Sequence, residues 1–210
     1  MTDPHRFTEA GPHPRLAFVV EEPLLARFFL LLQQGVKIRR RVGCSVDVFL
    51  RQELGAAPET IEKIQSIMLD GKPVDDIGSA LIHEGSVLAL SAAMPGLVGA
   101  TLRRGGAYSS FRSGITYHET ETTCTPGEGW VTVKLFNLLM AELGPGLLQT
   151  GVLVRSSDLA GFLMERAEEF QPGCSATLDG NPVDVRMLQE HAALAGNQLF
   201  FTVAVGTVSA

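Results

Sequence analysis

The sequence predicts an α+β protein made of two duplicated units, each a mixed sheet packed on one helix. Three observations predict this class: a length of 210 residues, a composition with 45% hydrophobic and 19% charged residues, and an internal repeat. The length fits two domains of about 100 residues each, and such a composition can bury a core in both. The expected organisation is a disordered N-terminal tail, a first unit, a Gly/Arg-rich linker and a second unit, at residues 1–15, 16–96, 97–129 and 130–210.

The internal repeat is clearest in two short segments with nearly the same sequence. Residues 69–75 read LDGKPVD and residues 178–184 read LDGNPVD, so the segments differ only at Lys72 and Asn181. A stretch of helical character precedes each segment, and a glycine turn with an apolar strand follows it. The same order of features in both halves of the chain indicates a duplicated unit.

In the first unit, hydrophobic spacing and turn residues predict a hairpin, a helix and two further strands. Ser45 is the expected N-cap of the helix, and Gly55 ends it, because apolar residues recur between them at spacings of three and four. Asp70 and Gly71 are expected to supply the positive backbone dihedrals of a tight turn. The expected strands are residues 27–32 paired with 36–42 in the hairpin, then 67–69 and 87–91.

The second unit is expected to repeat this order. A turn at residues 144–146 would join the strands of its hairpin, and Ser157 or Asp158 would cap its helix. Residues 135–143 also have helical spacing, so a helix is the alternative there, although we favour the strand. The expected strands are residues 131–139, 147–154, 176–178 and 199–205.

This order of elements resembles the β-grasp fold of ubiquitin-like and sulfur-carrier proteins, in which a mixed sheet wraps around one helix. The resemblance covers about residues 25–95 and 130–206, and it implies a tandem β-grasp fold. Members that act as carriers use a free C-terminal Gly-Gly, whereas this sequence ends GTVSA, so the resemblance implies no carrier chemistry. The internal RRGG at residues 103–106 is interpreted as a basic loop.

The linker at residues 97–129 contains the first candidate binding site. Arg103, Arg104 and Arg112 lie there among glycines, together with Tyr108. Guanidinium groups, glycine N–H groups and an aromatic ring could hold a small anionic or nucleotide-like ligand. A linker of this composition also joins domains without any ligand, and this is the interpretation that we favour.

A basic run on an expected strand is the second candidate. Alternation along residues 36–42 places Lys37, Arg39 and Arg41 on one exposed face and Arg40 with the apolar residues on the other. Such a stripe could contact a partner, and charged strands also protect a sheet from aggregation. The candidate contact residues of the whole chain are therefore Arg39, Arg41, Arg103, Arg104, Arg112 and Tyr108.

Residues 46–88 also resemble the small RNA-binding domain of a ribosomal small-subunit protein and of pseudouridine synthases, in which two helices precede a hairpin. The resemblance implies that basic side chains on the helices contact phosphate groups. Acidic residues outnumber basic ones on these expected helices, which makes a poor phosphate-binding surface. RNA binding is therefore the alternative function. The charged residues concerned are Asp47, Glu53, Glu59 and Glu62 against Arg51 and Lys63.

Catalytic and metal-binding patterns are weak in this sequence. His118, Glu119, Glu121 and Cys124 lie close together without a recognised ligand spacing, and the sequence has neither a nucleophile elbow nor a phosphate-binding loop. The aspartates of the two repeated segments are explained by their place in Asp-Gly turns, which aspartate side chains cap. The three cysteines form no C-x-x-C pair and predict neither a disulfide framework nor a cysteine zinc site. We therefore expect no catalytic residue, no metal and no cofactor.

Charge and hydropathy narrow the expected partners. A net charge of −6 is the wrong sign for a protein that coats nucleic acid without sequence preference. The longest apolar region, residues 16–32, is interrupted by charged residues and Pro23, so no membrane span is expected. The sequence shows no signal-peptide pattern and few cysteines, which favours the cytoplasm.

The predicted function is non-catalytic binding of a protein partner through a sheet edge or the Gly/Arg-rich linker. Homo-oligomers are among the expected assemblies. RNA binding and the binding of a small anion at the linker are the alternatives.

Overall fold

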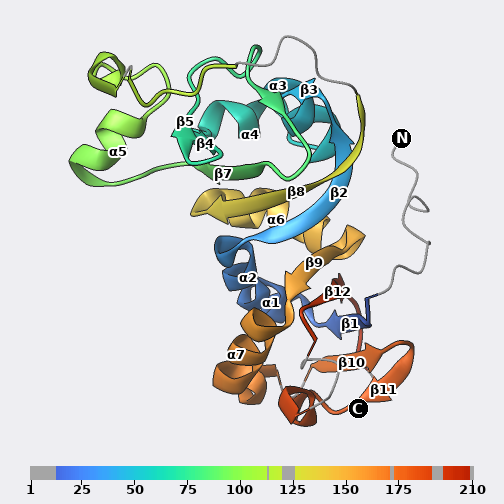
Figure 1. Cartoon of the computed structure of the whole chain (residues 1–210). Helices are drawn as coiled ribbons and strands as arrows, with labels where there is room; N and C mark the ends of the chain where they lie inside the picture. The colour runs from blue at the N-terminus through green and yellow to red at the C-terminus, as the bar shows by residue number, and fades with distance from the viewer. Residues whose placement is uncertain (1–12, 113, 120–125, 171–172, 191–195, 209–210) are drawn as a thin grey trace. The chain divides into compact units, whose positions relative to one another are not determined.

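The structure is a computed structural model that describes residues 13–112, 114–119, 126–170, 173–190 and 196–208 (Figure 1). These residues form helices and strands in a mixed α+β arrangement, which confirms the α+β part of the predicted class. The chain divides into two compact units: unit 1 is Met1–Val36 with Pro145–Ala210, and unit 2 is Lys37–Gly144.

Unit 2 contains a mixed sheet with the strand order β2-β8-β7-β4-β5. β7 runs parallel to β8, whereas β4 runs antiparallel to both β7 and β5. The helix after β2 starts as expected, because the Ser45 hydroxyl accepts a hydrogen bond from the Val48 amide at 3.3 Å. The elements are β2 (Val36–Val42), β3 (Cys44–Ser45), α3 (Val46–Val48), η2 (Phe49–Glu53), α4 (Pro58–Lys63), β4 (Ser66–Leu69), β5 (Lys72–Pro73), β6 (Leu81–Ile82), β7 (Val87–Ser91), α5 (Gly96–Leu102), η3 (Ser109–Arg112), β8 (Gly127–Phe136) and the first part of α6 (Leu138–Thr150).

The sheet strands of unit 1 lie in the order β11-β10-β1-β12-β9. β1 runs parallel to β12 and antiparallel to β10, and β12 runs antiparallel to β9. The elements are β1 (Arg15–Val20), α1 (Glu22–Leu25), η1 (Ala26–Phe28), α2 (Phe29–Gln34), the rest of α6, β9 (Val152–Arg155), α7 (Ser156–Arg166), η4 (Ala167–Phe170), β10 (Cys174–Leu178), β11 (Asn181–Val183), η5 (Val185–Glu190) and β12 (Gln198–Val205).

Helices occupy much of both predicted hairpins. Residues 22–34 form α1, η1 and α2, and residues 138–150 form α6. Gly35 and Gly151, at φ of 110° and 97°, follow α2 and α6, and the amide of each donates to the carbonyl four residues earlier. Both glycines therefore end helices. Gly35 does not form the expected hairpin turn, and the turn expected at residues 144–146 lies inside α6. Both hairpin predictions are wrong, because a continuous apolar run has no alternation that separates a strand from a helix.

In the second repeat, two further expectations change. The helical alternative for residues 135–143 describes α6 better than the favoured strand did. α7 begins at Ser156, so Ser157 and Asp158 lie in its first turn and do not cap it. The Asp158 carboxylate instead accepts a hydrogen bond from the Arg155 guanidinium at 2.8 Å.

The division into units differs from the division into repeats. β1 belongs to the first repeat but pairs with β10 and β12 of the second, and β8 belongs to the second repeat but pairs with β7 of the first. In the five-strand order of each unit, four strands therefore come from one repeat and one interior strand comes from the other. The expected ranges 16–96 and 130–210 follow the repeat, whereas the compact units follow strand pairing, which is set by hydrogen bonds between distant segments.

The repeated LDG turn makes the same contacts in both units. Asp70 and Asp179 have φ of 51° and 50°, and the glycine after each also has a positive φ, as the turn prediction requires. The Asp70 carboxylate accepts a hydrogen bond from the Val87 amide at 2.7 Å, and that of Asp179 accepts one from the Arg15 amide at 2.8 Å. Val87 begins β7 and Arg15 begins β1, so β7 and β1 hold equivalent places in the two sheets.

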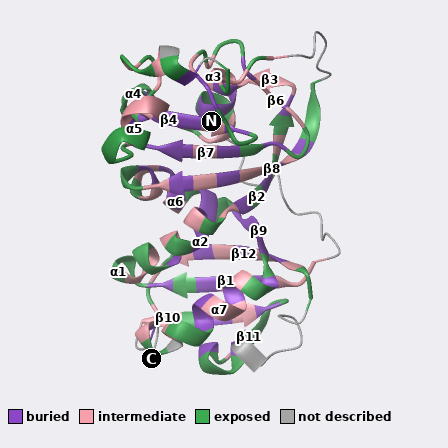
Figure 2. Cartoon of the chain, turned by 60° about the vertical axis from the view of Figure 1, so that its left-hand side comes forward, coloured by how far each residue is buried: buried purple, intermediate pink, exposed green. Residues whose placement is uncertain are grey.

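The cores of the two units differ in composition. Unit 1 buries a cluster of five phenylalanines whose ring centroids lie 4.8 to 6.3 Å apart. In unit 2, the buried side chains of β4, β7 and β8 are almost all aliphatic, and buried and half-buried positions alternate along β7 and β8 (Figure 2). The five residues of the unit 1 cluster are Phe18, Phe28, Phe162, Phe170 and Phe201.

Candidate functional site

The chain between β7 and β8 is folded against unit 2 around a buried arginine. Arg112 is 5% exposed, and its guanidinium binds both carboxylate oxygens of Asp75 at 2.7 and 3.0 Å. The same guanidinium donates to the carbonyls of Thr101 and Arg103 at 2.6 and 3.2 Å. One side chain therefore joins the end of α5, the residue after it and the turn that follows β5.

This arrangement changes the role expected for Arg112. Its guanidinium is committed to a carboxylate and two backbone carbonyls, so it is a structural group and does not offer its charge to a small anion. Breaking a buried ion pair leaves a charge without compensation and is strongly destabilising.

Other hydrogen bonds hold the same chain segment in place. The Arg104 amide donates to the Gln65 carbonyl at 2.7 Å, and the Tyr117 amide donates to the Pro73 carbonyl at 2.8 Å. The Asn137 side-chain amide donates to the Ala93 carbonyl. A Cβ added to Gly99 would lie 1.7 Å from the carbonyl oxygen of Met94, so α5 approaches the chain before it at a distance that only glycine permits.

The fixed segment leaves large apolar side chains in solvent. Phe111 is 82% exposed, Leu97 74%, Val98 63% and Ile115 59%. α5 and η3 contact each other, and the Phe111 and Tyr108 ring centroids lie 6.1 Å apart. We call Leu97, Val98, Tyr108, Phe111 and Ile115, together with exposed Arg103, the α5 surface; Figure 1 shows α5 on the side of unit 2 where β4 and β5 lie.

The predicted contact residues fall into two groups. Arg103, Arg104 and Tyr108 lie in the segment that carries the α5 surface, next to β5. Arg39 and Arg41 lie on β2, at the opposite end of the strand order of unit 2. Tyr108 and Phe111 were expected as aromatic groups of the linker, whereas Leu97, Val98 and Ile115 were not expected to take part, although large apolar residues in a Gly/Arg-rich segment are the signal that could have revealed them.

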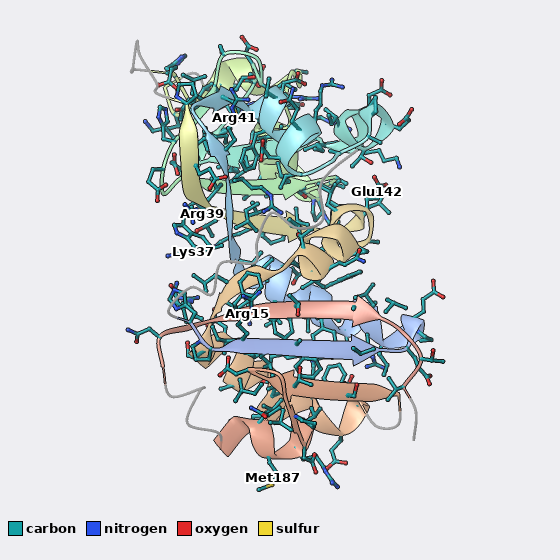
Figure 3. The ribbon with its side chains drawn as sticks, turned by 90° about the vertical axis from the view of Figure 1, so that its right-hand side faces the viewer. Arg15, Lys37, Arg39, Arg41, Glu142 and Met187 are labelled. Carbon is teal, nitrogen blue, oxygen red and sulfur yellow. The ribbon has the colours of Figure 1, made fainter. Side chains whose placement is uncertain are left out.

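The predicted alternation along β2 is confirmed. Lys37, Arg39 and Arg41 are exposed, and Figure 3 shows them following one another along the strand. Arg40 is half-buried and donates to the Glu53 carbonyl at 3.1 Å. Arg39 forms an exposed ion pair with Glu128 at 3.3 Å.

The outer edge strands of the two sheets are poorly suited to pairing with another chain. β5 and β11 are short, and each contains a proline, Pro73 or Pro182, which has no N–H to donate. The Pro73 carbonyl already accepts the Tyr117 amide. The linker route of the predicted function is therefore better supported than the sheet-edge route.

The group around Glu119 acts as a local brace. The Glu119 carboxylate accepts hydrogen bonds from the Leu81 amide at 3.2 Å and the Tyr117 hydroxyl at 2.9 Å, and lies 3.3 Å from His83 Nε2. Glu121 and Cys124, considered above with Glu119 as metal ligands, lie outside the described residues. Within the described part of the chain, no group of three or more His, Cys, Asp or Glu side chains is placed to hold a metal ion.

The thiol of Cys174 shows no sign of activation. Cys44 and Cys174 are both half-exposed. Burial raises the pKa of the Cys174 thiol to about 11, so this group stays protonated at neutral pH and is a poor nucleophile.

Fold and surfaces together define a class: a mixed α+β protein with two sheet-containing units and an exposed apolar surface held on one of them. No family model matches this chain, and neither does any curated protein or solved structure. In the residues that the structure describes, no helix is long and apolar enough to span a membrane.

Proposed function

We propose that this chain is a non-catalytic interaction protein built from two β-grasp-like units, and that it binds a protein partner through the α5 surface. The observation that carries the proposal is the exposure of Leu97, Val98, Phe111 and Ile115 on a segment that Arg112 ties to unit 2. We keep the cytoplasm as the proposed compartment, on the ground of the few cysteines.

The β-grasp part of the proposal rests on the arrangement within each unit. Each unit has a parallel pair of interior strands, β7 with β8 or β1 with β12, and a helix that follows β2 or β9. The repeated LDG turn fixes the strand beside it through the same two kinds of hydrogen bond in both units. These common features support a duplicated fold in which one central strand comes from the other repeat.

Exposed apolar side chains on the neighbouring elements α5 and η3 support binding because leaving them in water is unfavourable. Burying a large apolar side chain gains about 1.5 to 3 kcal/mol relative to leaving it exposed. Exposed apolar patches on soluble proteins commonly mark interaction sites. The hydrogen bonds of Arg112, Arg104 and Tyr117 fix the backbone beneath the surface in advance, which lowers the entropy that binding must cost.

The charge around the α5 surface indicates the chemistry of the partner. Arg103 is exposed and Arg104 half-exposed, and both flank the apolar residues in sequence. An apolar peptide segment that also carries acidic side chains would bury Phe111 and Leu97 and place its carboxylates near these guanidinium groups. We therefore commit to an acidic, apolar segment of a different protein as the occupant.

The test uses the intact chain and a library of short random peptides displayed on phage. Peptides are selected on the wild-type chain and counter-selected on the Leu97→Ser/Phe111→Ser variant. We expect enriched peptides that combine apolar and acidic residues, and an affinity loss of about tenfold or more in the variant. A Met164→Ser/Met187→Ser variant, which changes two side chains of unit 1 that are 72% and 60% exposed, should bind the same peptides as the wild type.

Three outcomes would overturn the proposal. Enriched peptides without acidic residues would contradict the stated chemistry, and equal binding by the Leu97→Ser/Phe111→Ser variant would contradict the stated surface. Sedimentation that shows a dimer disrupted by the same variant would assign the α5 surface to a second copy of this chain.

The two alternative functions are weakened at some of their expected binding groups. Both basic side chains on the helices of the RNA-binding resemblance are in ion pairs, Arg51 with Asp47 at 3.0 Å and Lys63 with Glu142 at 2.6 Å. Of the three arginines expected to hold a small anion at the linker, Arg112 is buried and paired with Asp75. Neither alternative is proposed through those residues.

A further inference from the structure

The sheet of unit 2 has two chemically different faces. Leu88 and Leu90 on β7 and the odd-numbered residues of β8 from Val131 onward are buried, and the helices of unit 2 also bury apolar side chains. The core therefore lies on that face. On the other face, Val87, Ala89, Thr132 and Lys134 are exposed or half-exposed, and the strand register aligns Val87 with Thr132 and Ala89 with Lys134. Ser66 and Ser91, further along the same face, are buried.

Basic side chains are concentrated on this second face. Lys37, Arg39 and Arg41 of β2 are exposed there, and Lys134 of β8 is half-exposed. Glu128 is the only acidic residue in the five strands of this sheet, and it lies beside Arg39. The side chains of Lys37, Arg41 and Lys134 form no ion pair with any described residue. A chain of net charge −6 thus carries a local cationic face.

Two aromatic side chains lie on the same face as these cations. Trp130 and Phe136 alternate with the buried residues Val131, Val133 and Leu135 along β8, so they project to the opposite side from the core. Both are half-exposed. The alternation of apolar and other residues along β8 is a signal from which both positions could have been predicted.

We propose that this face of unit 2, formed by Lys37, Arg39, Arg41, Trp130, Lys134 and Phe136, binds single-stranded nucleic acid. The cations contact the phosphates, and the aromatic rings stack with unpaired bases. The pairing of cations with aromatic rings on a sheet favours single strands over duplexes, because the bases of a duplex are already stacked and a flat sheet does not enter a groove. The proposal is independent of the α5 surface, which lies next to β5.

Unit 1 provides an internal comparison for this proposal. The equivalent face of its sheet carries Ala17, Val19, Thr202 and Phe200, and the Arg15 guanidinium lies over the Phe200 ring at 4.8 Å from its centroid. Phe200 therefore has a cation over its ring and few basic neighbours on its face. We expect no nucleic-acid binding by this face of unit 1.

The test uses Trp130, which is the only tryptophan of the chain. Intrinsic fluorescence therefore reports on the proposed face without a label. Oligouridine and oligothymidine are titrated into the intact chain at low and at physiological salt. We expect at least one of the two polymers to quench the fluorescence of Trp130 to saturation, with an affinity that falls as the salt concentration rises. The affinities for oligouridine and oligothymidine then show whether RNA or DNA is preferred.

Matched variants separate the proposed face from overall charge. Lys37→Ala/Arg41→Ala removes two cations of the face, whereas Arg51→Ala/Arg186→Ala removes two cations that sit in exposed ion pairs elsewhere. We expect the affinity of the first variant to fall about tenfold or more at low salt. The slope of the logarithm of its binding constant against the logarithm of the salt concentration should be smaller by about 1.4. The affinity of the second variant should change little. Phe136→Leu should weaken binding by about fivefold or more, and Phe200→Leu should not.

Several results would overturn this proposal. Oligonucleotides that leave Trp130 fluorescence unchanged would contradict base stacking. Equal weakening by the two double variants would mean that only overall charge matters. Quenching by polyglutamate or heparin as strong as that by oligouridine and oligothymidine would show that a polyanion without bases suffices.

Discussion

Unit 1 and unit 2 share a repeated turn but use its last residue differently. In unit 2, Asp75 reaches Arg112, which lies 37 positions further along the chain, and the guanidinium of the pair is buried whereas the carboxylate is half-exposed. In unit 1 the matching Asp184 pairs with Arg186 at 2.7 Å, two positions further on and in solvent. The comparison teaches that the same short turn sequence serves both units, whereas the long connection between β7 and β8 gives unit 2 the Arg112 contacts and, with them, an exposed apolar surface.

The contrast between core and surface phenylalanines gives the largest expected effect. Phe28 is fully buried in the unit 1 cluster, whereas Phe111 is 82% exposed on unit 2. Phe28→Ala should lower the free energy of unfolding by about 4 kcal/mol, because it leaves a cavity in a packed core. Phe111→Ala should change it by less than about 0.5 kcal/mol. Urea denaturation of both variants measures the difference, and a Phe111→Ala cost close to that of Phe28→Ala would mean that Phe111 belongs to the core.

The two Asp–Arg pairs give the next effect. Arg112→Ala removes the charge opposite Asp75 and the donors to two carbonyls, and should lower the free energy of unfolding by about 3 kcal/mol. Arg186→Ala breaks an exposed pair and should have little effect. The same denaturation measurement compares them. Equal effects of the two substitutions would show that the Arg112 pair is no more important to the fold than a surface pair.

Substitution of two helical glycines by alanine should change the stability of the two units in opposite directions. Gly99 in α5 has no room for a Cβ beside the Met94 carbonyl, whereas a Cβ on Gly161 in α7 would meet nothing within 4 Å. Gly99→Ala should displace α5 and destabilise unit 2 by about 1 to 3 kcal/mol. Gly161→Ala should stabilise the chain by about 0.5 to 1 kcal/mol, since alanine loses less entropy in a helix. Thermal melting of both variants checks the signs, which should be opposite.

Local signals account for what could be predicted. The alternation along β2, the Ser45 cap and the positive φ of Asp70 all depend on neighbours a few residues away, so the sequence alone was sufficient for them. Residues 22–34 were misread because a short, nearly continuous apolar run is compatible with both a strand and a helix.

Contacts between distant residues account for what could not be predicted. The pairing of β1 with β12 and of β7 with β8 depends on which strands find each other in space, and alternation does not encode it. The same holds for the candidate site. Nothing near Arg112 in the sequence marks Asp75 as its partner. The sequence therefore predicts a candidate binding arginine at this position, whereas the side chain is buried and paired with Asp75.

The smallest expected effect is a difference in acid sensitivity between the units. A hydrogen bond from Lys63, then one from Thr60, lowers the pKa of Glu142 below the usual value of 4.5. Lys63 and Glu142 are 79 positions apart, so they meet only in the folded chain. Glu142 therefore stabilises the fold above pH 4.5, and this contribution is lost as the pH falls below that value through the folded pKa.

Asp184 provides the matched case in unit 1. Hydrogen bonds from Arg186 lower its pKa too, but the two residues are neighbours in the unfolded chain as well, so the pKa differs less between the two states. Glu142→Gln should flatten the decline of the urea midpoint between about pH 4.5 and about pH 3, whereas Asp184→Asn should decline like the wild type. Parallel curves for all three proteins would mean that the Lys63–Glu142 pair does not couple protonation to folding, and that unit 2 is no more acid-sensitive than unit 1.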